Sequence, residues 1–134
     1  MIDALNHDVA TQMLREAMEA PERCAAQIAL NAKLVRNAGQ RLRALAPPFA
    51  ATLARGSSDQ AAAFAKALLE TRASIPTLSH APSIGSLYHA TSPLFRGVPM
   101  IAISQSGRSP DLIAAAQDAQ RQGALIVAIV NDAA

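Results

Sequence analysis

Short apolar runs alternate with helical patterns through most of this chain, and this alternation restricts the fold more than any other feature. After Pro47-Pro48, apolar runs typical of strands occupy residues 49–54, 77–81, 98–104 and 125–130, and helical patterns lie between them at 59–72, 82–96 and 109–122. The second of these runs is weak, and the 82–96 segment reads as a short helix within loops. Strands that alternate with helices form parallel βαβ units. We therefore expect an α/β fold with a doubly wound parallel sheet.

The N-terminal part has a different pattern. Residues from about Asp8 to Ala46 are helical in character, and Pro21 predicts a break between two helices. Ile28, Val35 and Leu42 then recur every seven residues, a stripe that could pack on its own domain or on a partner helix. The expected division is a helical lead-in over residues 1–46 and a second domain over residues 47–134.

Composition narrows the class of protein. The chain has 134 residues, of which 51% are hydrophobic, so it can bury one real core. Its net charge is +2, its cations are scattered and aromatics make up only 3%, so we expect no nucleic-acid partner. Neither a signal peptide nor a membrane-spanning apolar run is visible, which predicts a cytoplasmic protein without a membrane partner.

A hydroxyl-rich loop follows the apolar run that ends at Ser104. The loop continues through Gln105, Ser106 and Gly107, and a helix then begins with Ser109 as its N-cap and Pro110 in its first turn. Hydroxyl groups and the unpaired N–H groups of a helix start are suited to binding an anion. The alternative is a well-capped turn that binds nothing.

A second small-residue loop, Gly56-Ser57-Ser58, follows the first strand of the domain. In a sheet of order 2-1-3-4 the first and third strands are neighbours, and ligands bind where their carboxyl ends diverge. We therefore expect one binding site formed by both loops, with these residues: Gly56, Ser57, Ser58, Ser104, Gln105, Ser106, Gly107 and Ser109. Arg55 and Arg108 could add positive charge to this site, but the favoured role for both is that of a solvated surface residue. Asp111 is expected to interact with its helix dipole.

Other chemistry has little support in the sequence. His80 and His89 lie in or beside loop-rich sequence without a visible partner of the kind that a general base needs. No metal-ligand spacing, GxGxxG motif or Walker loop occurs, so we expect no metal and no cofactor. The single cysteine, Cys24, excludes a disulfide within the chain and is expected to be a small core residue.

The two loops together resemble the sugar isomerase (SIS) domain family. Met13, Glu16, Glu19 and Pro21 are also similar to the lead-in of glucosamine-6-phosphate synthase (glutamine–fructose-6-phosphate aminotransferase, isomerising) and its relatives without a glutaminase domain. The resemblance implies a flavodoxin-like domain, of which the fifth strand is missing here, and a bound sugar phosphate. It implies phosphate contacts from Ser104, Gln105, Ser106 and Ser109, with Ser57 and Ser58 nearby.

The sequence departs from the synthase pattern in three ways. No glutaminase domain precedes the lead-in, and Arg108 and Ser83 stand where the synthase has glutamates. The family's catalytic glutamate, histidine and lysine belong to a later part of the family sequence, so the catalytic residues are unknown here. The resemblance therefore implies a truncated first SIS domain of the glutaminase-less branch.

These observations lead to one main hypothesis and two alternatives. The main hypothesis is phosphosugar binding as the N-terminal part of an amino-sugar isomerase or aminotransferase, inactive alone and homodimeric. The alternatives are a non-catalytic phosphosugar sensor of a regulator and a structural remnant. A sensor would require an N-terminal helix-turn-helix, and residues 1–46 lack its short helices and tight glycine turn.

Overall fold

A computed structural model describes residues 11–88, 90 and 93–131 of the chain. The chain forms two compact units, one up to Arg41 and the other from Leu42 onward, which are described separately below. The first consists of most of helix α1 (Gln12–Leu45), and the second contains the sheet and every other helix that is described.

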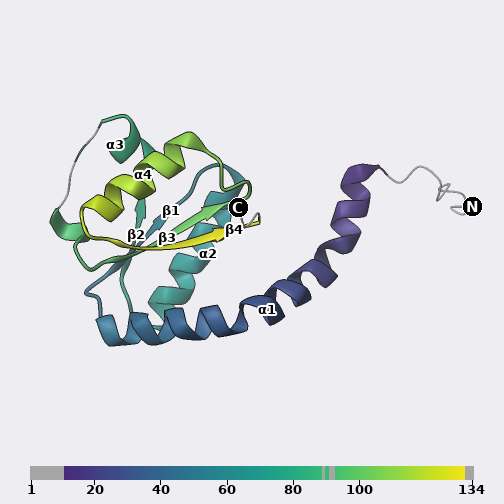
Figure 1. Cartoon of the computed structure of the whole chain (residues 1–134), viewed down its shortest axis with the longest axis horizontal. Coiled ribbons are helices and arrows are strands. Elements are labelled where there is room, and N and C mark those ends of the chain that lie inside the picture. Colours follow the sequence, from purple (N-terminus) through teal and green to yellow (C-terminus); the bar gives the residue numbers. More distant parts are fainter. Residues whose placement is uncertain (1–10, 89, 91–92, 132–134) are drawn as a thin grey trace, which may run out of the picture. The chain divides into compact units, whose positions relative to one another are not determined.

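Helix α1 runs through Pro21 without a break, so the prediction of two helices was wrong. A proline inside a helix removes one hydrogen bond and bends the helix, but its fixed φ angle is compatible with helical backbone. The flanking residues are strong helix formers such as alanine, glutamate and arginine, which keep the helix intact. Figure 1 shows α1 bending in its N-terminal half. Cys24 is exposed on this helix, contrary to the expectation of a core position.

The sheet has four parallel strands in the order β2-β1-β3-β4, which confirms the predicted fold class. The strands are β1 (Ala50–Leu53), β2 (Thr77–His80), β3 (Pro99–Ser104) and β4 (Leu125–Val130). β1 and β3 occupy the centre, and all four residues of β1 are buried. A strand buried on both faces needs a continuous apolar run, which is the pattern of residues 49–54.

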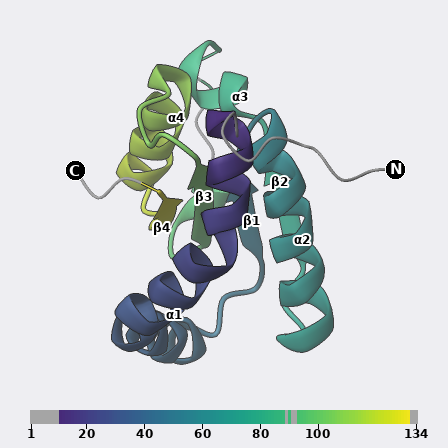
Figure 2. The same cartoon turned by 90° about the vertical axis from the view of Figure 1, so that its right-hand side faces the viewer.

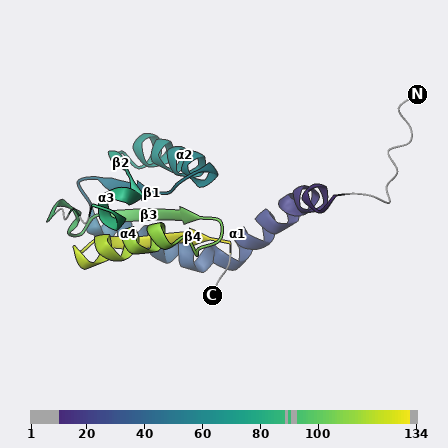
Figure 3. The same ribbon diagram turned by 90° about the horizontal axis from the view of Figure 1, so that it is seen from above.

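Two long helices cover opposite faces of this sheet, as the view from above shows (Figure 3). α2 (Ser57–Arg72) connects β1 to β2, and α4 (Pro110–Arg121) connects β3 to β4. The connection from β1 to β2 and the connection from β3 to β4 run outward from the central strands in opposite directions. Because such crossovers are right-handed, their helices lie on opposite faces of the sheet. The short helices α3 (Pro82–Ser86) and η2 (Pro93–Phe95) lie between β2 and β3. Figure 2 shows the same layers from a second direction.

The main core lies between the sheet and α4. Small residues of α4, Ala115 and Ala119, are almost fully buried against Leu53 and Met100 of the central strands. Because these side chains are small, α4 can pack close to the sheet without large aromatics. This close packing holds the first turn of α4 beside the ends of β1 and β3.

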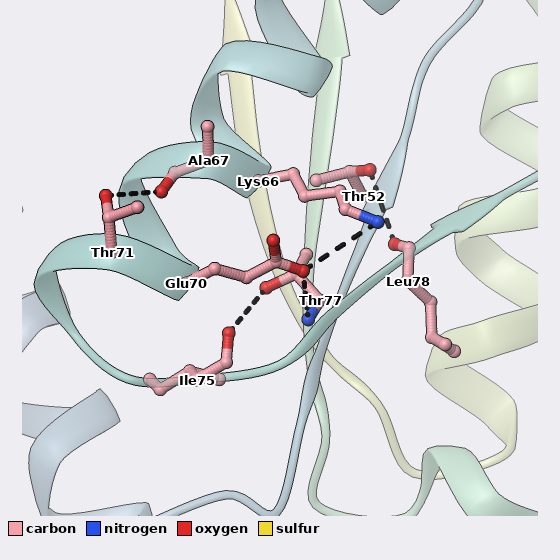
Figure 4. A network of polar contacts seen from close by, with 8 residues as sticks. All are labelled: Thr52, Lys66, Ala67, Glu70, Thr71, Ile75, Thr77 and Leu78. Carbon is pink, nitrogen blue, oxygen red and sulfur yellow. Dashed lines mark hydrogen bonds and ion pairs between the residues drawn. The ribbon is translucent and has the colours of Figure 1, made fainter.

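On the opposite face, a polar network joins α2 to β2 (Figure 4). Glu70 Oε1 accepts a hydrogen bond from the backbone N–H of Thr77 at 3.2 Å and lies 3.8 Å from Lys66 Nζ. In the central strand, the hydroxyl of Thr52 donates to the carbonyl of Leu78 at 3.4 Å. These contacts fix the end of α2 against the start of β2.

Candidate functional site

The carboxyl ends of β1 and β3 form one side of an open cavity of about 390 Å³. The two strands are direct neighbours, with Ala51 opposite Met100 and Leu53 opposite Ala102. Their connections leave toward opposite faces of the sheet, so a crevice opens between the two loops that follow them. The cavity is lined by Arg55, Gly56, Ser57, Ser58, Ser104, Gln105, Ser106, Ser109 and Leu112.

The structure brings together seven of the eight residues that the sequence indicates, all except Gly107. Gly107 belongs to the same loop but has a different task. Its φ is +65°, and an added Cβ would lie 3.3 Å from Cγ1 of Val130. Gly107 therefore allows the loop to turn tightly against the end of β4 and does not line the cavity.

Hydroxyl groups of the β3–α4 loop are oriented by the backbone. Ser104 Oγ accepts the backbone N–H of Gly107, and Ser106 Oγ accepts that of Arg108, each at 3.2 Å. A hydroxyl that accepts a hydrogen bond keeps its own proton available for donation. The cavity thus has serine donors whose oxygen positions are fixed before any ligand arrives.

The remaining uncharged polar side chains of the cavity make no hydrogen bond to another described residue: Ser57, Ser58, Gln105 and Ser109. Ser109 is the N-cap of α4, as predicted, but its hydroxyl makes no capping bond. α2 begins at Ser57 after its N-cap Gly56, so Ser58 lies in the first turn of the helix. These groups can donate to or accept from a ligand without first giving up a bond to the protein.

Two helix N-termini lie at the cavity. α2 starts at Ser57 and α4 at Pro110, and the first turn of each contributes to the lining. The first N–H groups of a helix have no partner within the helix, and the helix dipole gives that end a partial positive charge. An anion bound between the loops would meet both favourable ends.

Gly56 provides the backbone conformation that starts α2 at this position. Its φ is 58° and its ψ is −136°, a combination that residues with a Cβ avoid. No atom lies within 4 Å of the position of an added Cβ, so the requirement for glycine comes from the backbone angles and not from crowding.

The structure adds one cavity residue that sequence reasoning missed, Leu112, and brings in Arg55, which the sequence favoured as a solvated surface residue. Leu112, which is 7% exposed, contributes apolar surface to the cavity; its position three residues after Ser109, one helical turn on, is a signal that could have identified it. Arg55 also lines the cavity, and its Nη1 lies 3.3 Å from Oδ2 of Asp111. Asp111 lies in the first turn of α4, as expected for a residue that favours the helix dipole.

His80 does not line this cavity. It ends β2, and its ring makes an edge-to-face contact with Phe95, with ring centres 5.0 Å apart. Burial lowers the pKa of His80 below 6.5, and the carboxylate of Asp118 partly opposes this shift. His89 lies outside the described residues.

Within residues 11–88, 90 and 93–131, no cluster of histidine, cysteine, aspartate or glutamate side chains is arranged to hold a metal ion. The helices described there are too short or too polar to cross a membrane.

Comparison with known proteins agrees with this architecture. Residues 50–134 match the SIS domain. A glutamine–fructose-6-phosphate aminotransferase (isomerising) from Halobacterium salinarum is 38% identical over 79 residues, which cover 59% of this chain and 13% of that protein. The chain therefore spans only a small part of this relative.

Solved structures share the fold. A candidate phosphosugar isomerase from Silicibacter pomeroyi DSS-3 is 38% identical, with a TM-score of 0.86 over 92% of this chain and 37% of that one. The C-terminal domain of glucosamine-fructose-6-phosphate aminotransferase from Francisella tularensis is 20% identical, with a TM-score of 0.74 over 96% and 37% of the two chains. Because the SIS domain match covers more than half of its length, this chain belongs to the SIS domain family.

Proposed function

We propose that this chain binds a sugar phosphate in the cavity between the β1–α2 and β3–α4 loops. The observation that carries the proposal is the convergence of five serine side chains, one glutamine and two helix N-termini on one cavity. Such a set of neutral donors favours an oxyanion, and it needs no metal to hold a phosphate group. Gln105 and Leu112 provide an amide and an apolar surface suited to a sugar.

We further propose that this binding is one part of an amino-sugar isomerase or aminotransferase reaction. In a ketose–aldose isomerisation a base moves a proton between C1 and C2 of the sugar. Holding the phosphate at the other end of the molecule fixes these carbons relative to that base. Membership of the SIS domain family and the resemblance to a candidate phosphosugar isomerase support this assignment.

We propose that this chain binds the sugar phosphate without efficient turnover, and the lining of the cavity supports this. Among the described residues this lining holds one charged side chain, the cation of Arg55, and neither a carboxylate nor an imidazole that could serve as a base. A coupled isomerase assay with fructose 6-phosphate should therefore detect little or no turnover by this chain. Robust turnover would show that a base from elsewhere in the chain reaches the substrate.

Binding itself can be tested by thermal shift with fructose 6-phosphate and glucosamine 6-phosphate. A ligand that binds only the folded state at ten times its Kd stabilises it by about 1.4 kcal/mol, which raises the Tm of a domain of this size by roughly 5 °C. Unphosphorylated fructose is the control ligand and should have no effect. An unchanged Tm at millimolar sugar phosphate would contradict the proposal.

A serine substitution connects the effect to the cavity. Ser106→Ala should weaken sugar phosphate binding roughly tenfold, because it removes one hydrogen bond to a charged group. Ser79→Ala removes an exposed hydroxyl from the edge strand β2, outside the cavity, and should leave the affinity unchanged. Equal affinities of both variants and the unaltered chain would place binding elsewhere.

A further inference from the structure

We propose that Arg55 is a phosphate-binding residue that selects doubly charged esters, and that Asp111 positions its guanidinium group. This inference rests on the proposed sugar phosphate site. The geometric basis is the pairing of a cavity-lining arginine from the β1–α2 loop with a carboxylate from the first turn of α4.

The charge balance of the cavity leads to this assignment. Every other polar residue in the lining is neutral, so Arg55 supplies its only full positive charge among the described residues. A phosphate ester carries a charge of about −1.5 to −2 near pH 7. Neutral donors bind any oxyanion, whereas a guanidinium group binds an oxyanion more tightly as its negative charge increases.

The geometry of the ion pair leaves the arginine able to bind a ligand. The contact joins one nitrogen, Nη1, to one carboxylate oxygen at 3.3 Å, and an arginine has five N–H donors. The Arg55 side chain is 58% exposed and that of Asp111 is 35% exposed, so the pair adds little to stability on its own. One contact to Asp111 therefore orients the group while other donors remain available for phosphate oxygens.

The location of Asp111 also suits a positioning residue. Asp111 does not line the cavity, whereas its helix neighbours Ser109 and Leu112 do. Its carboxylate is held by the first turn of α4, the same turn that we expect to meet the anion. The pair thus connects the two binding loops directly and places the arginine at their junction.

The test compares two esters of the same sugar that differ in charge. Glucosamine 6-phosphate carries nearly two negative charges on its ester near pH 7, and glucosamine 6-sulfate carries one. Isothermal titration calorimetry measures both dissociation constants for the unaltered chain, Arg55→Gln and Arg72→Gln. Arg72→Gln is the matched control. It removes the same charge at the C-terminal end of α2, about 23 Å along the helix from the N-terminal end beside the cavity.

The expected result is a change in selectivity as well as in affinity. Arg55→Gln should weaken phosphate ester binding roughly tenfold and sulfate ester binding less, so that the ratio of the two constants falls several-fold. Arg72→Gln should change neither constant. If Arg55→Gln binds both esters like the unaltered chain, the inference is wrong and the proposed function stands. If the unaltered chain binds neither ester, the proposed function itself is wrong.

A double-mutant cycle tests the role of Asp111. Asp111→Asn should weaken phosphate binding a few-fold when Arg55 is present, because the arginine loses its orientation. In the Arg55→Gln background the same substitution should leave binding unchanged or tighten it, because it removes a negative charge near the anion. Tighter binding by Asp111→Asn with Arg55 present would show that Asp111 acts only by repulsion and would overturn its positioning role.

Discussion

Gly56 shows how a single residue connects backbone geometry with the candidate site. Its φ and ψ of 58° and −136° let the short connection from β1, which ends at Leu53, turn directly into α2 at Ser57. This turn presents Ser57 and Ser58 to the cavity. A residue with a Cβ in this conformation is strained whatever the space around it.

Gly56→Ala should therefore lower the free energy of unfolding by about 1–3 kcal/mol and weaken sugar phosphate binding. Chemical denaturation and calorimetry measure the two effects. Gly97→Ala is the control, because Gly97 also has a positive φ, +71°, and no atom near the added Cβ, but it does not line the cavity. It should lower stability without changing the affinity, and a loss of affinity in both variants would indicate a general folding effect.

His80 predicts how stability depends on pH. Its folded pKa lies below the unfolded value of 6.5 because burial disfavours the charged ring. Between these two pKa values the unfolded state binds more protons, so stability is full above about pH 6.5 and falls as the pH decreases through this window. Tm measured from pH 8 to pH 5 should decline for the unaltered chain and decline less for His80→Gln. Parallel curves would contradict this role for His80.

At the scale of elements, α2 shows the limits of a periodic pattern. The sequence groups Phe64, Ala67, Leu68 and Thr71 on one face, which would ordinarily be the buried one. In the structure Phe64 is 67% exposed, and Ala62 is the residue of α2 that is buried. Close packing over the central strands selects the small side chain, so the larger apolar residues face outward.

Glu70 should be the polar residue of α2 that contributes most to the attachment of this helix to β2. Glu70→Ala should lower the free energy of unfolding by about 1–2 kcal/mol, because the backbone N–H of buried Thr77 loses its acceptor. Lys66→Ala removes only a 3.8 Å exposed ion pair and should cost less than about 0.5 kcal/mol. Urea denaturation measures both, and equal losses would mean that the ion pair and not the backbone contact matters.

At the scale of the whole molecule, β4 is an apolar outer strand of the sheet that the structure describes. Within the described residues β4 pairs only with β3, and Ile129 is 48% exposed. Strand register places Val127 beside Ile101 and Ile129 beside Ile103. The core residues Met100 and Ile126 point toward α4, so this second set lies on the opposite face. Unpaired edges of this kind favour association with another chain.

We therefore expect the protein to form a homodimer, through this edge or through the apolar stripe of α1. Light scattering should report a dimer at a protein concentration of tens of micromolar, because stable interfaces have dissociation constants at or below this order of magnitude. Ile129→Lys, which adds a charge to the β4 edge, should shift the mass toward the monomer if the edge is the interface. A dimer that is unaffected by this change would point to α1, and a monomeric unaltered chain would contradict self-association.

Local patterns in the sequence determined the elements of the sheet domain and the identity of most cavity residues. The apolar run at 125–130 coincides with β4, and the two serine loops follow from the ends of the runs at 49–54 and 98–104. These features depend on neighbouring residues and on the general rule that parallel strands expose their carboxyl ends at one edge. For this reason they could be predicted without coordinates.

Tertiary packing decided the features that depend on distant residues. The outward direction of Phe64 and the pairing of Arg55 with Asp111 both escaped the sequence. Each is a balance between a local preference and the contacts of a whole helix or of two separate loops, and such contacts exist only after the chain has folded. The sequence by itself thus determined that the two serine loops meet at the ends of β1 and β3. Only the folded chain decided that Arg55, paired with Asp111, lies beside them.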